Sequence, residues 1–159
     1  MAPISLQRLT CQSPSSTAIM PLCAKIQEEV LRTMSQPCPC GSAKPAPQCC
    51  SLYLSGKSYP NTAEALMRSR FTAYVTKNIP YLQKSWHPDT CPELNAEELT
   101  TDWSRLEVIK SKQGLKKSIV EFKAWYLDDG QEYALHEISL FKLHKKRWVY
   151  LGPLDQWPE

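Results

Sequence analysis

Four cysteines lie within thirteen residues of this chain, and they constrain its fold more than any other feature. Cys38 and Cys40 flank a proline, and the adjacent pair Cys49-Cys50 follows after eight further residues. The surrounding segment, residues 34–60, holds five of the thirteen prolines and shows no continuous apolar periodicity. A segment of this kind cannot build a hydrophobic core of its own, so it needs a metal ion or a neighbouring domain to hold it.

The spacing of these cysteines favours a metal over disulfides. The chain has seven cysteines, an odd number, and neighbouring cysteines rarely pair with each other. Zinc bound by thiolates needs four sulfurs in a tetrahedron at about 2.3 Å from the ion. We therefore predict that Cys38, Cys40, Cys49 and Cys50 form a closed zinc site. Such a site is structural, because no coordination position stays open for a substrate. A redox-active pair would explain only two of the four positions, and incidental cysteines would explain none.

Charge and hydropathy narrow the classes of function. The formal net charge is +3, from 19 basic and 16 acidic residues, which is too small a surplus to predict nucleic-acid binding. No apolar stretch approaches the roughly 20 residues that cross a membrane. Dense cysteines of this kind suit a reducing compartment. We expect a cytoplasmic protein whose partner is another protein, with neither a membrane nor a nucleic acid as partner.

Hydrophobic periodicity divides the chain into three parts. Residues 1–33 form an N-terminal extension that is expected to be poorly ordered, although its second half shows helical spacing. The extension has no acidic residue through position 27, which is compatible with a targeting segment, but we favour an extension ahead of an internal start at Met34. Residues 34–60 form the cysteine knuckle. Residues 61–159 form the main domain.

The main domain is predicted to be α+β because the period of its pattern changes near Trp103. Before this residue, Asn61 or Thr62 can cap a helix with apolar residues at spacings of three and four, and two shorter helices follow. After it, the period changes to two along four predicted strands, and Asp128-Asp129-Gly130 marks a hairpin turn. Helices followed by an antiparallel meander predict a curved sheet with helices on one face.

Two resemblances accompany these patterns. The segment Cys38-Pro39-Cys40-Gly41-Ser42, with Cys49-Cys50, resembles the SEC-C motif, the zinc-binding segment at the C-terminus of the preprotein translocase ATPase SecA. From Met34 to about Leu151 the chain also resembles the YchJ family of uncharacterised bacterial proteins. That resemblance rests on the joint order of Ala63–Tyr74, Trp86-His87-Pro88, His136–Phe141 and Arg147–Tyr150. It implies that the main domain is a cone similar to nuclear transport factor 2, abbreviated NTF2.

Polar residues at apolar positions of the main domain mark a second candidate site. Arg68 and Arg70 lie among apolar helix positions, and Glu137 shares a strand face with Phe141. A carboxylate on an inward face must be paired or protonated, because burying it alone costs several kcal/mol. Two interpretations stay open: a buried Arg–Glu pair, which we favour, and a ligand pocket inside the cone. The candidate residues are Arg68, Arg70, Tyr74, Trp86, His87, Glu137 and Ser139.

The function that follows is a zinc-binding, non-catalytic protein-interaction module. No nucleophile with its base and orienting group is visible in the sequence. His136 would point to the opposite face of its strand from Glu137, so the two are not expected to form a catalytic pair. The alternative is a small enzyme or small-molecule binder that uses the cone cavity around Arg70, Trp86 and Glu137.

Overall fold

The computed structural model describes residues 20–158, and the chain divides into two units, Met1–Thr33 and Met34–Glu159. The first unit contains most of helix α1 (Met20–Ser35), which agrees with the helical spacing of its sequence. Its apolar residues Ile26, Val30 and Leu31 are all exposed. The expected poor order of the extension falls largely on residues 1–19, which lie outside the described residues, so it stays a prediction. None of the helices among residues 20–158 is both long and apolar enough to span a membrane.

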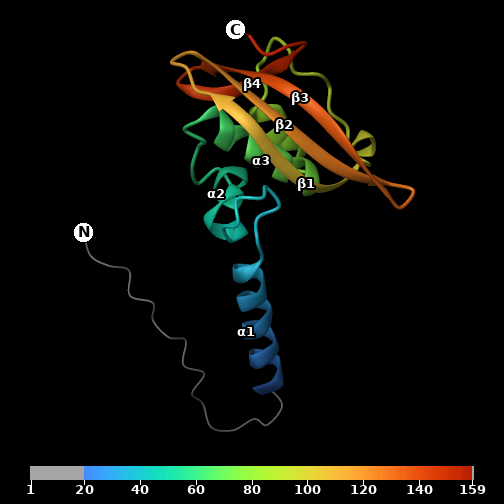
Figure 1. The fold of residues 1–159 in the computed structure, drawn as a ribbon. Coiled ribbons are helices and arrows are strands. Elements are labelled where there is room, and N and C mark those ends of the chain that lie inside the picture. The colour runs from blue at the N-terminus through green and yellow to red at the C-terminus, as the bar shows by residue number, and fades with distance from the viewer. Residues whose placement is uncertain (1–19, 159) are drawn as a thin grey trace, which may run out of the picture. The chain divides into compact units, whose positions relative to one another are not determined.

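The second unit is built on a four-stranded antiparallel meander, in the order β1-β2-β3-β4 (Figure 1). The strands are β1 (Asp102–Lys112), β2 (Lys117–Asp128), β3 (Gln131–His144) and β4 (Arg147–Leu154). Two tight hairpins connect β2 to β3 and β3 to β4. Their central residues, Asp129-Gly130 and Lys145-Lys146, all have positive φ, the conformation that two-residue hairpin turns require. The predicted α+β meander is confirmed.

Short helices precede the sheet along the chain. They are η1 (Ala46–Gln48), α2 (Cys50–Leu54), α3 (Ala63–Val75), α4 (Ile79–Lys84) and η2 (Ala96–Glu98). Helix α3 begins where the sequence predicts, because the Thr62 hydroxyl accepts a hydrogen bond from the Ala65 amide at 3.1 Å. Helix α4 begins at Ile79, because the Asn78 side chain caps it by accepting a hydrogen bond from the Tyr81 amide at 3.1 Å.

The hydrophobic core lies between α3 and one face of the sheet (Figure 1). Every second residue of β2 from Ser118 to Ala124 is buried, which is the period-two pattern of a half-covered sheet. Register shifts in β1 and between β3 and β4 bend the strands. The curved sheet therefore covers α3 as one wall of a cone, and this arrangement leaves room for a pocket between them.

Candidate functional site

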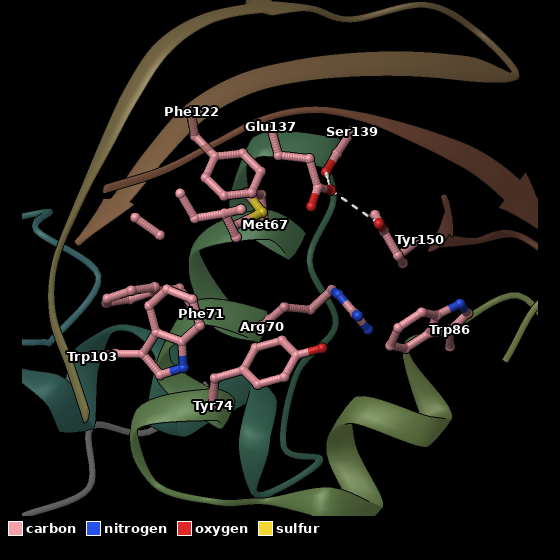
Figure 2. Close-up of a pocket in the computed structure, with 12 residues that line it drawn as sticks. Met67, Arg70, Phe71, Tyr74, Trp86, Trp103, Phe122, Glu137, Ser139 and Tyr150 are labelled. Atoms are coloured by element: carbon pink, nitrogen blue, oxygen red, sulfur yellow. Dashed lines mark hydrogen bonds between the residues drawn. The ribbon is translucent and has the colours of Figure 1, made fainter. Parts of the chain in front are cut away.

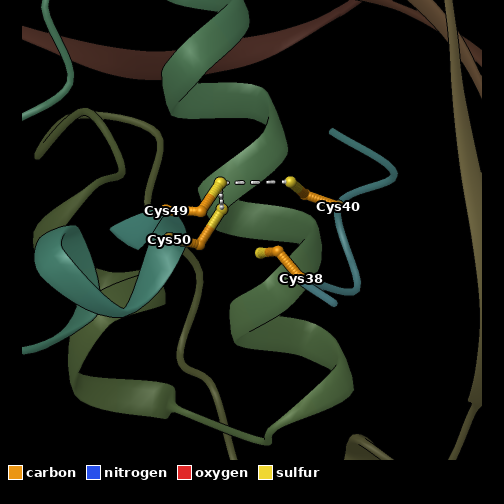
Figure 3. A group of neighbouring side chains, drawn as sticks. All are labelled: Cys38, Cys40, Cys49 and Cys50. Carbon is orange, nitrogen blue, oxygen red and sulfur yellow. Dashed lines mark hydrogen bonds between the residues drawn. The ribbon is translucent and has the colours of Figure 1, made fainter. Parts of the chain in front are cut away.

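The four cysteine side chains of the knuckle converge on one point (Figure 3). All four Sγ atoms lie within 4.8 Å of one another. The Sγ atoms of Cys40 and Cys49 are 3.6 Å apart, and those of Cys49 and Cys50 are 3.9 Å apart. A regular tetrahedron with metal–sulfur bonds of about 2.3 Å has sulfur–sulfur edges of about 3.8 Å. The donor set thus fits a tetrahedral metal ion, and none of these four cysteines forms a disulfide.

Backbone contacts fold the knuckle around these sulfurs. The Cys38 amide donates to the Lys44 carbonyl at 2.8 Å, which closes the loop that carries Cys38 and Cys40. The Ser42 hydroxyl lies 3.2 Å from Cys40 Sγ and 3.1 Å from Cys49 Sγ. Hydroxyl contacts of this kind orient metal-binding thiolates from outside the coordination sphere.

The proximity of the thiols shifts their acidity. Hydrogen bonds from the Cys40 and Cys50 thiols lower the pKa of Cys38. The same contact with Cys38 raises the pKa of Cys50. One thiolate stabilised by its neighbours is the form of cysteine that binds a metal, and binding then releases the remaining protons.

Gly41 is the residue of the knuckle whose backbone conformation and surroundings least tolerate a side chain. Its φ is +73°, and a Cβ added there would lie 3.1 Å from the Leu106 carbonyl oxygen. Gly56 offers a matched control, because its φ is +75° but no heavy atom lies within 4 Å of an added Cβ. We expect Gly41→Ala to destabilise the protein by about 1 kcal/mol more than Gly56→Ala in chemical denaturation. Equal losses would contradict the close approach of the knuckle to β1.

The knuckle is attached to one face of α3. Arg68 Nη1 donates to the Cys40 carbonyl at 2.8 Å, and the Cys38 thiol lies 3.7 Å from the Thr72 hydroxyl. Arg68 also forms an ion pair with Glu64 at 3.0 Å. The suggestion that Arg68 joins a polar cluster with Glu137 is therefore wrong. Two residues along a helix turn by about 200°, so Arg68 and Arg70 cannot face the same neighbour.

The opposite face of α3 lines a cavity of about 240 Å³ inside the cone (Figure 2). One end is apolar, and its walls come from Met67, Phe71, Trp103 and Phe122. The other end carries most of the polar candidates of the sequence, namely Arg70, Tyr74, Trp86, Glu137 and Ser139. Five of the seven candidate residues thus line one cavity, which supports the interpretation as a ligand pocket.

Arg70 is buried in the polar end of this cone pocket, with 3% of its surface exposed. Its Nη1 donates to the Leu82 carbonyl at 3.1 Å and to the Ser85 hydroxyl at 2.7 Å. The guanidinium carbon lies 4.6 Å from the ring centroids of both Trp86 and Tyr150. Burial lowers the pKa of Arg70, yet a guanidinium stays charged because its ordinary pKa is so high.

Glu137 faces the same pocket without touching Arg70. Its Oε1 accepts hydrogen bonds from the Ser139 hydroxyl and, at 2.9 Å, from the Tyr150 hydroxyl. Burial raises the pKa of Tyr150, so its hydroxyl stays protonated and donates. No ion pair joins Arg70 to Glu137 among residues 20–158, which corrects the favoured Arg–Glu pair of the sequence. The reason is Tyr150, whose ring covers the guanidinium while its hydroxyl holds the carboxylate.

Comparison with known proteins decides the family. Residues 62–153 match the family model described as the middle NTF2-like domain of YchJ. A UPF0225 protein of Photorhabdus laumondii is 40% identical over 134 residues, which cover 77% of this chain and 84% of that protein. The chain belongs to the YchJ-like UPF0225 family. A second UPF0225 protein of this family, from Cupriavidus pinatubonensis, is 42% identical over 111 residues and covers 69% of this chain and 78% of that protein.

Two solved structures share the YchJ-like fold together with the motif. The solution structure of a SEC-C motif containing protein from Rhodopseudomonas palustris has a TM-score of 0.71 and 28% identity, covering 77% of this chain and all of that one. The crystal structure of a SEC-C motif containing protein from Psychrobacter arcticus has a TM-score of 0.67 and 27% identity, covering 80% and 86%. These comparisons confirm the NTF2-like cone and the SEC-C resemblance.

The histidines of the YchJ-like domain lie away from the pocket. His87 is buried, but its backbone amide donates to the Tyr150 carbonyl at 2.7 Å and its ring packs against His144. His87 is therefore not part of the pocket lining, which corrects its place among the candidate cavity residues. His136 contacts Glu121 at 2.8 Å on the outer face of the sheet, so it faces away from Glu137 as predicted.

Sequence reasoning missed Tyr150 and Trp103 as pocket residues. Tyr150 alternates with Trp148 along a strand, and an aromatic residue in that pattern is usually part of a core. Only the register of β4 against β3 shows that its hydroxyl reaches Glu137.

Replacing Glu137 tests whether it holds the YchJ-like cone together. Because its carboxylate contacts two hydroxyls and no cation, Glu137→Gln is expected to leave the free energy of unfolding unchanged within about 1 kcal/mol, or to raise it. The measurement is urea denaturation of the metal-loaded protein. A loss of about 3 kcal/mol, the usual cost of breaking a buried ion pair, would restore the pair interpretation.

Proposed function

We propose that this protein binds a small molecule in the cone pocket, while Cys38, Cys40, Cys49 and Cys50 hold one structural zinc ion. The observation that carries the pocket proposal is Arg70, a buried cation without an ion pair among the described residues, on the wall of a 240 Å³ cavity. Burying such a charge is unfavourable, and proteins retain unfavourable groups where function requires them.

Zinc is the metal that best suits the knuckle. Four thiolates in a tetrahedron select zinc or iron among the common metals, and zinc is the usual ion of closed structural sites. With all four positions filled by sulfur, the ion would connect the loop of Cys38 and Cys40 to the start of α2. Its contribution would be folding energy, with no open position for chemistry.

The pocket is the better candidate for a binding site than the knuckle. Cys38, Cys40 and Cys50 are buried, and the loop that carries them is bonded to Arg68 and Thr72 of α3. Most of the cysteine cluster therefore lies against the protein's own helix. The interaction module favoured from the sequence stays a prediction, and the small-molecule binder becomes the leading proposal.

Ligand binding can be tested by nuclear magnetic resonance on the zinc-loaded full chain. Titration with a library of single-ring fragments is expected to shift the indole signals of Trp86 and Trp103, which line the pocket, but not those of Trp125 and Trp157. Ala124→Leu fills the pocket from β2 and should abolish these shifts. Ala134→Leu is the matched control, because Ala134 is exposed and lies on the opposite face of the sheet. Shifts that persist in Ala124→Leu, or that never occur, would refute the proposal.

A further inference from the structure

The size of the cone pocket limits its ligand. Drug-sized ligands occupy pockets of about 300–1,000 Å³, and the cavity here measures about 240 Å³. It therefore suits a molecule with a single ring or one branched side chain. The apolar end, with Phe71, Trp103 and Phe122, would take the body of such a molecule (Figure 2).

At the polar end, Arg70 is prepared to receive an anion. A guanidinium has five donors, and the bonds to Leu82 and Ser85 use two of them. The rings of Trp86 and Tyr150 fix its plane. An immobilised planar guanidinium is well suited to a carboxylate, which it can bind through two parallel hydrogen bonds.

Glu137 offers the opposite charge to the same ligand. Ser139 and Tyr150 both donate to Oε1, whereas a carboxylate has about four acceptor sites on two oxygens. The side chain points into the cavity across from Arg70 (Figure 2). Its remaining acceptor sites can receive an ammonium group.

Tyr150 keeps these two charges from neutralising each other. Its ring lies against the guanidinium and its hydroxyl is bound to the carboxylate, so a cation and an anion border the same cavity without forming an ion pair. A ligand with only a negative charge would be repelled by Glu137, and one with only a positive charge would be repelled by Arg70. A ligand that carries both charges next to each other satisfies the two groups together.

We infer that the ligand of the cone pocket is a small amino-carboxylate zwitterion with an apolar body, of the size of one apolar amino acid. This inference rests on the proposed function and deepens it. The ammonium group would bind Glu137, the carboxylate would bind Arg70, and the apolar body would lie against Phe71, Trp103 and Phe122.

Two matched series of probes test the charge requirement. The first consists of L-phenylalanine, 3-phenylpropionate and phenethylamine, and the second of L-leucine, 4-methylpentanoate and isoamylamine. In titrations at neutral pH monitored by the Trp86 and Trp103 indole signals, at least one amino acid should bind about tenfold more tightly than both of its singly charged analogues. The inference is overturned if, in both series, an analogue with one charge binds as tightly as the amino acid.

Variants at the two charges should change this selectivity in opposite directions. Arg70→Met should lower the affinity for the amino acid and for the carboxylate analogue about tenfold, and should raise the affinity for the amine. Glu137→Gln should lower the affinity for the amino acid and for the amine, and should raise the affinity for the carboxylate analogue. Glu121→Gln is the control, since Glu121 contacts Lys110 and His136 on the outer face and should leave all affinities unchanged. Equal effects of Glu121→Gln and Glu137→Gln would overturn the inference.

The outcomes also separate this inference from the proposed function. If fragments shift Trp86 and Trp103 while neither amino acid is preferred, the zwitterion is excluded and the pocket remains a binding site. If no fragment and neither series shifts these signals, both proposals fall.

Discussion

Replacing Cys38 and Cys40 together with serine is expected to remove the metal and to cause a larger loss of stability than any single substitution in the cone. A structural zinc ion contributes on the order of 10 kcal/mol to the folding of small zinc-dependent segments. Wild-type protein purified under reducing conditions should contain about one zinc per chain by elemental analysis, and the double variant should contain none. The control is Cys91→Ser, because Cys91 is a free cysteine that lies outside the cluster.

The loss should be confined largely to the knuckle. The main core cluster of α3 and the sheet contains no cysteine, and it is built from residues such as Leu66, Phe71, Val120 and Phe141. We therefore expect the cone to keep a cooperative thermal transition when zinc is chelated, at a lower midpoint. A chelator that abolishes the transition altogether would show that knuckle and cone fold only together. Zinc-free wild-type protein in which all seven thiols titrate, the four of the cluster as well as the three outside it, would refute the metal site itself.

Arg70→Ala is expected to cost about 3 kcal/mol of stability, because it leaves a cavity between two aromatic rings. The lost hydrogen bonds matter less, since the Ser85 hydroxyl also donates to the Leu82 carbonyl and both groups keep a partner. Arg70→Met keeps most of the packing and removes the buried charge. It should therefore cost less than about 1 kcal/mol, or increase stability.

Urea denaturation of both Arg70 variants distinguishes packing from charge. If Arg70→Met is as destabilising as Arg70→Ala, the positive charge of Arg70 itself stabilises the fold. The stabilisation would then come from attraction between Arg70 and Glu137. The double variant Arg70→Met with Glu137→Gln would then lose less than the sum of the two single changes. Additive losses are expected, because Tyr150 separates the two groups.

The parts of the fold that depend on local sequence could be predicted well. The Thr62 cap, the Asp129-Gly130 turn and the convergence of four cysteines each follow from residues close together in the chain. The helical phase of α3 could not be predicted, because α3 is buried on more than one face: the sheet covers one and the knuckle another. The sequence alone therefore cannot tell which of Arg68 and Arg70 faces the sheet and which faces the knuckle.

Contacts between distant residues account for the remaining errors of prediction. The sequence suggests that Glu137 needs a cation, since the usual partner of an inward carboxylate is a basic residue. The structure instead supplies two hydroxyls, one of them from β4, and this depends on strand register. The buried position of His87 outside the pocket depends in the same way on its contact with Tyr150.

We assign the metal to folding and the pocket to binding, and X-ray absorption at the zinc edge tests this division most directly. Reduced, zinc-loaded full-length protein should show four sulfur neighbours at about 2.3 Å and no lighter ligand. The spectrum should not change when a pocket ligand such as L-phenylalanine is added at saturation. A spectrum with three or fewer sulfurs and an oxygen or nitrogen neighbour, or one that changes on adding the ligand, would contradict this division and place the chemistry at the metal.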